Sequence, residues 1–221
     1  NSAPQLVIEY SLPGQFVLQV LHASDLEGGV DAITDAPAFA AIVDQLEDEY
    51  ANTVTISSGD NYIPGPFFNA ASEDPIEDSL RAILSDFYGT PLNNLGAERG
   101  RIDIAMTNAI RFNASVFGNH EFDQGEGAVA DIILGSGNAS ALGWMGAQFP
   151  YLSANLDFSG SFLNSSRVAN VQDASNFVVD VTNPANASST PKIAPATILN
   201  VNGEQIGVVG ATTQLLAQIS S

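Results

Sequence analysis

Carboxylate, amide and imidazole side chains gather in three short polar turns of this sequence. Asp25 and Glu27 lie two residues apart in the first turn, Asp60 lies in the second, and Asn119 and His120 are neighbours in the third. Hard oxygen donors and imidazole bind divalent cations that activate water for attack on phosphate, and such sites hold two ions roughly 3.5–4 Å apart. Asp60 can bridge two ions because a carboxylate has two oxygens with several lone pairs. The residue types therefore predict a two-metal site suited to phosphate chemistry.

Each polar turn directly follows a segment with the pattern of a buried strand. The predicted strands cover residues 16–23, 53–57 and 114–117, and each is rich in apolar or β-branched side chains. Between the first two strands, apolar residues recur at helical spacing over 37–50 and predict an amphipathic helix. In α/β sheets, ligands bind outside the carboxyl ends of the strands, so the three turns should converge.

The alternation of strands and helices continues along the chain and favours an α/β fold. Further elements are expected as helices over 76–87, 98–112 and 125–134 and a strand over 151–155. From 158 to 195 Ser, Asn, Ala and Pro dominate, and residues 177–181 are the one clear strand expected there. Asn202-Gly203 predicts a hairpin turn between strands 196–201 and 205–211.

The composition is that of a globular protein with an acidic surface. A length of 221 residues suits one domain, and 45% of the residues are apolar. Asp and Glu total 25 against 6 Lys and Arg, so the formal charge of -19 disfavours nucleic-acid partners and anionic lipid. This charge fits a protein that collects divalent cations, and it equally fits salt tolerance. The absence of Cys excludes disulfides, thiolate metal sites and cysteine nucleophiles. No apolar run reaches the roughly 18–20 residues that a membrane span requires.

Five motifs, in order, carry a resemblance to a known family. They are VLHASDLEG at 20–28, SGDN at 58–61 with Gly65-Pro66, FGNHEFDQG at 117–125, YLSAN at 151–155 and IGVVGATT at 206–213. The first three resemble the signatures of metallophosphoesterases, the calcineurin-like superfamily, and more narrowly the N-terminal catalytic domain of the 5'-nucleotidase/UDP-sugar hydrolase family. The resemblance implies a layered αββα sandwich of mixed β-sheets flanked by helices. It implies an N-terminal extension over 1–15 and the N-terminal part of the catalytic domain over 16–221, with the C-terminal remainder absent from this chain.

The resemblance also implies a role for each candidate residue. The metal ligands would be Asp25 and Glu27 on the first ion, Asp60 as the bridge, and Asn119 on the second ion. His120, oriented by Asp123, would stabilise the transition state or protonate the leaving alkoxide. The implied activity is metal-dependent hydrolysis of phosphate monoesters, 5'-nucleotides or related nucleotides, for extracellular phosphate scavenging. It would use two divalent ions, which could be Zn, Mn, Fe, Mg or Ca, in a secreted, periplasmic or cell-surface protein.

The sequence departs from the family pattern in ways that leave alternatives open. Glu27 stands where the family usually has His, and a carboxylate suits Mg, Ca or Mn better than Zn. The family's downstream histidine ligands have no counterpart, because the chain holds only His22 and His120. The second ion then has too few ligands, so we expect another polypeptide segment to complete the site. The alternatives are a non-catalytic surface or assembly module with a degenerate metal site, and a phosphodiesterase acting on cyclic nucleotides.

Other residues near the motifs are expected to serve the structure. Glu121 should satisfy neighbouring hydrogen-bond donors without binding metal, and His22 should pack within the first strand. Asn61 lies beside the expected crevice and is more simply interpreted as structural than as a contact to substrate.

Overall fold

The computed structural model describes residues 15–26, 29–96, 98–138 and 141–220. Its main sheet has five parallel strands in the order β1-β2-β3-β6-β8. These strands are β1 (Gln19–Ala23), β2 (Thr53–Ser57), β3 (Ala114–Val116), β6 (Tyr151–Leu152) and β8 (Ile193–Ala194). The register pairs the last residues of β1 and β2, Ala23 with Ser57, and Ser57 with Ser115 of β3. The polar turns that follow these strands consequently start at the same edge of the sheet.

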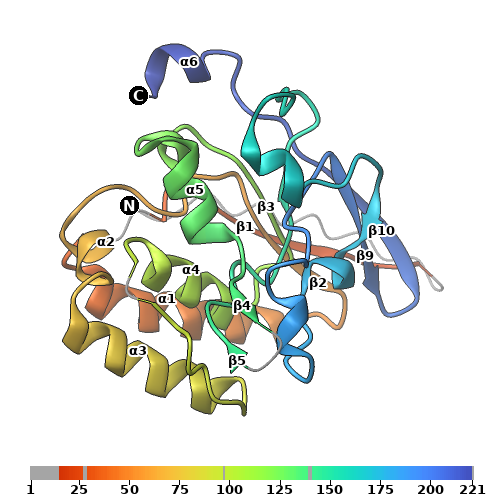
Figure 1. The fold of residues 1–221 in the computed structure, drawn as a ribbon. Coiled ribbons are helices and arrows are strands. Elements are labelled where there is room, and N and C mark those ends of the chain that lie inside the picture. Colours follow the sequence, from red (N-terminus) through yellow and green to blue (C-terminus); the bar gives the residue numbers. More distant parts are fainter. Residues whose placement is uncertain (1–14, 27–28, 97, 139–140, 221) are drawn as a thin grey trace.

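Helices cover one face of this sheet (Figure 1). The longer ones are α1 (Ala32–Glu47), α3 (Asp74–Phe87), α4 (Arg101–Ile110) and α5 (Gly125–Ile133). Side chains such as Leu84 of α3, Ile104 of α4 and Ile132 of α5 share one apolar core with Tyr151 and Ile193 of the sheet. Alternate strand residues therefore point toward the helices, as a half-buried pleated strand requires.

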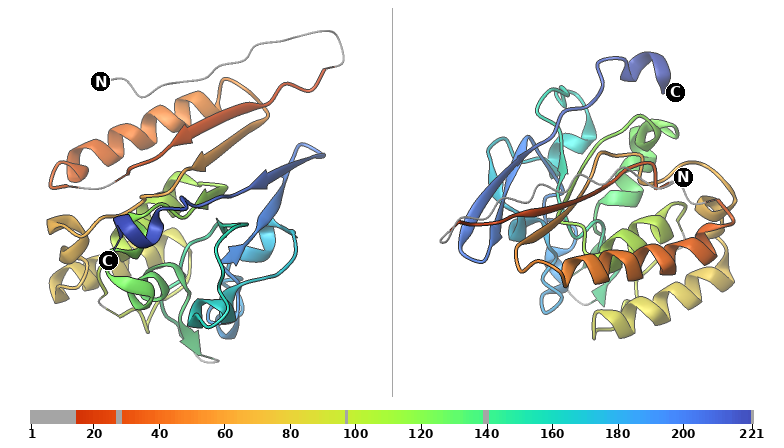
Figure 2. Two further views of the ribbon diagram at one scale, coloured as in Figure 1. Left: turned by 90° about the horizontal axis from the view of Figure 1, so that it is seen from above. Right: turned by 180° about the vertical axis from the view of Figure 1, so that it is seen from behind.

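A second sheet packs on the opposite face (Figure 2). It contains β7 (Gln172–Asp173), β9 (Ala196–Val201) and β10 (Glu204–Val209), in the order β10-β9-β7. Val54 of β2 packs against Leu199 and Val201, and Val208 packs against the core that contains Leu152. The β9–β10 turn confirms the predicted hairpin, because Asn202 and Gly203 both have positive φ, at 50° and 93°.

The prediction of an α/β fold with a helix-flanked sheet is confirmed. The described residues form three layers of the expected αββα sandwich, namely helices, parallel sheet and second sheet. The shorter elements are α2 (Pro66–Ala70), α6 (Leu216–Ile219), β4 (Gly137–Asn138), β5 (Ala141–Leu142) and the 3-10 turns η1 (His120–Phe122), η2 (Phe162–Ser166), η3 (Ala174–Phe177) and η4 (Pro184–Asn186). In the described part of the chain, no helix is long and apolar enough to cross a membrane.

Several predicted elements differ from the structure, and the strands expected over 16–23 and 151–155 are shorter, at Gln19–Ala23 and Tyr151–Leu152. Residues 177–181 do not form a strand: η3 ends at Phe177, and the N–H of Val179 donates to Oε1 of Gln148 at 3.0 Å. The Gln148 side chain thus accepts the hydrogen bond that a neighbouring strand would have accepted from this N–H group. Helix α1 begins at Ala32, five residues before the predicted start, and contains Pro37. The proline removes only the hydrogen bond to the carbonyl of residue 33, near an exposed helix end.

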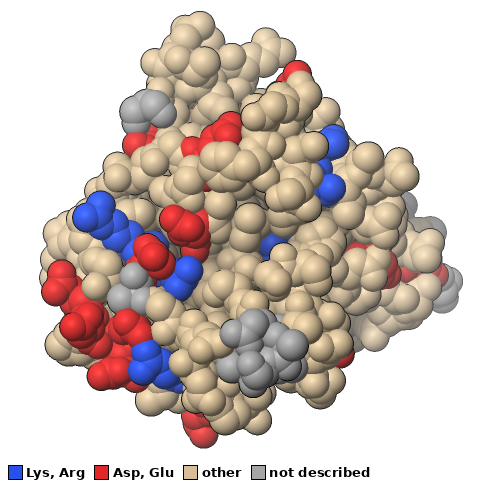
Figure 3. Space-filling view, in the orientation of Figure 1, with Lys and Arg blue, Asp and Glu red and all other residues tan. Residues whose placement is uncertain are grey.

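Acidic side chains gather on the surface near the start of α3 (Figure 3). Asp74 and Asp78 are exposed there, and Arg81 forms ion pairs with Glu77 and Asp78. Ion pairs at the protein surface add little stability, so the negative charge mainly favours solubility and the attraction of cations.

Candidate metal centre

Backbone hydrogen bonds hold the three polar turns against one another. The N–H of Asp25 donates to the carbonyl of Gly59 at 3.2 Å, which joins the first turn to the second. The N–H of His120 donates to Oδ1 of Asp60 at 2.7 Å, which joins the third turn to the second. Turns from distant parts of the chain are therefore in direct contact at the carboxyl ends of β1, β2 and β3.

The two aspartates have left-handed backbones. Their φ angles are 54° at Asp25 and 53° at Asp60. Asp tolerates this region better than most residues, but such conformations still cost about 1–3 kcal/mol and concentrate at functional sites. Both candidate ligands, each just after a parallel strand, have this uncommon backbone conformation, as residues of a functional site often do.

Glycine permits the close approach of the second and third turns. A Cβ on Gly59 would lie 2.2 Å from the N of Gly118, and a Cβ on Gly118 would lie 2.2 Å from Oδ1 of Asp60. Real Cβ atoms do not come this close to other atoms, so the contact between the turns requires both glycines.

The side chain of Glu121 connects the same two turns through hydrogen bonds. Its side chain is buried, at 1% exposure, and accepts the backbone N–H groups of Asp60 and Asn61 at 2.9 Å and of Gly118 at 2.8 Å. Burial raises the pKa of Glu121 to about 7, while these hydrogen bonds lower it. Because three N–H donors converge on its two oxygens, the carboxylate is the form that satisfies them. The expectation that Glu121 serves neighbouring donors is confirmed.

Asn61 links the ends of three neighbouring strands. Its Oδ1 accepts the Ser57 hydroxyl at 2.6 Å, and its Nδ2 donates to the Ser115 hydroxyl at 2.8 Å and the Tyr151 hydroxyl at 2.9 Å. The side chain is 1% exposed, so it braces the turn after β2. Sequence reasoning missed this network. The only available signal was the buried pattern of Ser57 and Ser115 before polar turns, and it does not identify their partner.

His120 and Asp123 form the pair predicted from the sequence. Nδ1 of His120 lies 2.6 Å from Oδ2 of Asp123, and both side chains are partly exposed. Ser220 also donates its hydroxyl to Oδ1 of Asp123 at 3.2 Å. A carboxylate on Nδ1 fixes the tautomer and orientation of the imidazole ring.

The remaining candidates are placed less completely. Glu27 lies outside the described residues, and Asn119 is half-buried at the start of η1. Carboxylate and amide oxygens suit a divalent cation by type. Within residues 15–26, 29–96, 98–138 and 141–220, however, no three His, Asp or Glu side chains lie close enough to hold a metal ion. The ligand set of Asp25, Glu27, Asp60 and Asn119 therefore stays a prediction.

His22 differs from the sequence expectation. It is exposed, and its Nε2 lies 2.5 Å from the Ser58 hydroxyl. Val20, two residues earlier on the same face of β1, is also 42% exposed. The described part of the second sheet does not cover this edge strand, so His22 is not packed.

No family model matches the chain. The trifunctional nucleotide phosphoesterase protein YfkN of Bacillus subtilis is 26% identical over 212 residues, which cover 94% of this chain and 12% of that protein. The snake venom 5'-nucleotidase of Crotalus adamanteus is 24% identical over 214 residues, which cover 91% of this chain and 26% of that protein. A solved 5'-nucleotidase precursor from Thermus thermophilus superposes with a TM-score of 0.49 at 20% identity, covering 91% of this chain and 30% of that one.

The chain spans less than a third of the length of each of these proteins. The curated relatives nevertheless align with nearly all of it. The resemblance predicted from the motifs is therefore confirmed, and the relatives of this chain are 5'-nucleotidases and nucleotide phosphoesterases.

Proposed function

We propose that this chain supplies part of the active site of a metal-dependent hydrolase that cleaves phosphate monoesters, with 5'-nucleotides or related nucleotides as substrates. The contact between the turns that carry Asp25, Asp60 and His120 is the observation that supports this most. Turns that meet at the carboxyl edge of a parallel sheet are the usual place for a ligand in α/β proteins. The names of the relatives supply the substrate class.

The proposed ligands of two divalent ions are Asp25, Glu27, Asp60 and Asn119. When bound, the ions would supply a hydroxide nucleophile and neutralise charge on the phosphate. The carboxylate at Glu27 favours Mg, Mn or Ca over Zn, although Zn and Fe stay among the candidates. Glu121 and Asn61 act as positioning residues, since they fix the turn that carries Asp60 without being ligands themselves.

His120 is proposed as the proton donor to the leaving group. The Asp123 carboxylate accepts a hydrogen bond from the Nδ1–H of His120 and favours the charged imidazolium ring. That ring can stabilise negative charge at a phosphate oxygen or give a proton to the leaving alkoxide. Asp123 is therefore a positioning residue in this scheme.

We also propose that a further segment of polypeptide completes the site. The ligands named above are few for two ions, and the relatives are several times longer than this chain. Residues 16–221 would be the N-terminal part of the catalytic domain, with 1–15 as an extension. The relatives named snake venom 5'-nucleotidase support a secreted, periplasmic or cell-surface location, where the enzyme would scavenge phosphate.

The test uses the full-length protein, with metal content and hydrolysis of AMP measured together. We expect two metal equivalents and an activity that a chelator removes and added metal restores. Asp60→Asn should lower metal content, whereas His120→Gln should keep the metal and lower kcat by about 10²–10⁴-fold. Asp86→Asn, at an exposed position on α3, is the matched control and should change neither.

The possible outcomes separate the candidate functions. Full activity after exhaustive metal removal would overturn the proposal. Faster cleavage of cyclic nucleotides than of AMP would indicate a phosphodiesterase. One weakly bound Ca²⁺ without turnover would indicate a non-catalytic surface or assembly module.

A further inference from the structure

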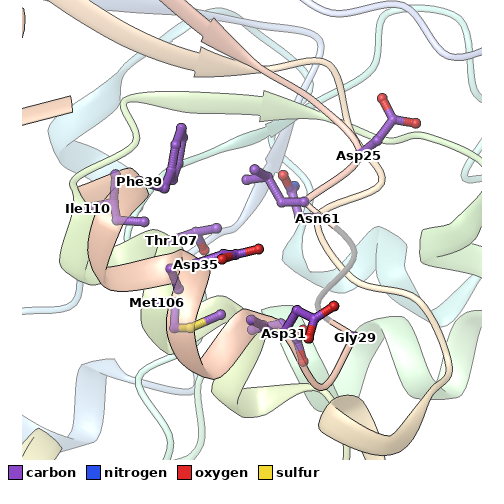
Figure 4. Close-up of a pocket in the computed structure, with 13 residues that line it drawn as sticks. Asp25, Gly29, Asp31, Asp35, Phe39, Asn61, Met106, Thr107 and Ile110 are labelled. Carbon is purple, nitrogen blue, oxygen red and sulfur yellow. The ribbon is translucent and has the colours of Figure 1, made fainter. Parts of the chain in front are cut away.

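A pocket of about 340 Å³ lies between α1, α4 and the turn after β1 (Figure 4). Asp31, which precedes α1, and Asp35 and Phe39 within it are spaced four residues apart and therefore lie on one helix face. Helix α4 contributes Asp103 and Ile110. Asp25 lies at one end of the pocket, and its carboxylate points away from the other labelled side chains (Figure 4).

The pocket has an acidic end and an apolar end. Asp31 and Asp35 are exposed and lie near the start of α1, whereas Phe39 and Ile110 lie together at the opposite end (Figure 4). Among the described residues, no Lys or Arg lines it. Within the described lining of the pocket, no basic side chain therefore balances the negative charge.

Asp103 makes this charge hard to explain by the fold alone. Its side chain is 1% exposed, and in the described part of the chain neither carboxylate oxygen has a hydrogen-bond partner. Burial raises the pKa of Asp103 to about 7, although its own backbone N–H lowers it. Its place in the first turn of α4 gives a favourable helix dipole. That interaction is weaker than the cost of removing a carboxylate from water. A cation bound in the pocket would favour the charged form of the Asp103 carboxyl.

We propose that this pocket binds a small organic cation, with its ammonium group at Asp31 and Asp35, its carbon skeleton against Phe39 and Ile110, and the buried carboxyl of Asp103 in the same lining. The exposed pair would contact the ammonium directly, and the buried carboxylate would attract it through a medium of low dielectric constant. The inference does not depend on hydrolysis of phosphate esters, because it concerns binding alone.

Two observations favour an organic cation over a metal ion. No three acidic or histidine side chains among the described residues are close enough to chelate a metal. The pocket is also much larger than a bare ion, and part of its lining is apolar, with Phe39, Met106 and Ile110. A ligand with both charge and hydrocarbon matches such a lining, whereas a hydrated metal ion does not.

The probe is choline, compared with its neutral carbon isostere dimethylbutanol, in calorimetric titrations of the full-length protein. We expect choline to bind with one-to-one stoichiometry and the isostere not to bind. Asp103→Asn and Asp35→Asn should each weaken choline binding by about tenfold, because each removes one charge. Asp44→Asn, exposed on α1 but away from the pocket, should leave it unchanged.

Several outcomes of these titrations would contradict the proposal. Equal binding of choline and its isostere, or variants that bind choline as the native protein does, would overturn it. If one equivalent of Mg²⁺ displaced choline from the native protein but not from Asp103→Asn, the pocket would be assigned to a metal instead. Asp35 lies on the surface, so Asp35→Asn tests the proposal even if Asp103→Asn does not fold.

Discussion

The buried carboxyl of Asp103 should give the protein an unusual dependence of stability on pH. Its pKa is raised from 3.8 to about 7 in the folded state, so between these values the folded protein binds more protons than the unfolded chain. The contribution of Asp103 to the free energy of unfolding must then fall as the pH rises from about 4 to about 7, and stay constant above that. This is the reverse of the behaviour of a carboxylate in a salt bridge.

The magnitude follows from the pKa values. A rise from 3.8 to about 7 is roughly 3 pKa units, and at about 1.4 kcal/mol for each the effect is about 4 kcal/mol. Solvent screening does not reduce it much, because the residue is 1% exposed. Asp103→Asn removes the ionisation but leaves a buried amide without partners, which costs about 1–3 kcal/mol at every pH.

The difference in stability between the variant and the native protein should therefore depend on pH. Near pH 5 the two effects should be similar in size and the two proteins similarly stable, whereas near pH 8 the variant should be more stable, by about 1–3 kcal/mol. Urea unfolding of both proteins at the two pH values measures this, and the change in stability between pH 5 and pH 8 should differ between the two proteins by about 3 kcal/mol, because pH 5 already lies above the unfolded pKa of 3.8. Other titrating groups cancel in this comparison. Parallel pH profiles for the two proteins would refute the reasoning.

Three further variants test other contacts. Gly118→Ala places a Cβ 2.2 Å from Oδ1 of Asp60, so we expect a loss of more than about 2 kcal/mol in urea unfolding and, if the protein folds, a loss of metal; native-like values would contradict the geometry. Glu121→Gln puts an amide where three N–H groups converge and should cost about 2–4 kcal/mol, whereas a neutral effect would show that the acid was protonated. Burial lowers the pKa of Lys192 from 10.5 to about 7, so the unfolded chain binds more protons between these values and stability should rise with pH there. Lys192→Met should abolish that rise, and a rise that persists in thermal unfolding would assign it to another group.

The sequence predicted the elements that have strong local patterns. Strand β2 (Thr53–Ser57) and the Asn202-Gly203 hairpin have the predicted bounds or nearly so, because alternating apolar residues and a turn dipeptide are local signals. The convergence of the turns was also predictable, since parallel strands in an α/β sheet share one carboxyl edge. The two-residue strand β8 was missed because it is too short to show a period.

Long-range contacts at the candidate site could not be predicted. Asn61 and Tyr151 are 90 residues apart in sequence, and no local pattern pairs their side chains. Asp103 looks like a surface residue in an amphipathic segment, and only the packing of α4 shows that it is buried. The motifs thus located the candidate ligands through resemblance, whereas the residues that brace them became visible only in three dimensions.

The bracing of the second turn also has an entropic consequence. The backbone of Asp60 is held by Glu121, and one oxygen of its carboxylate is held by the N–H of His120. A side chain fixed in this way has little rotational freedom left to lose when it captures a ligand. Affinity at this carboxylate should therefore depend mainly on stripping water from the arriving ligand, and only slightly on ordering the protein.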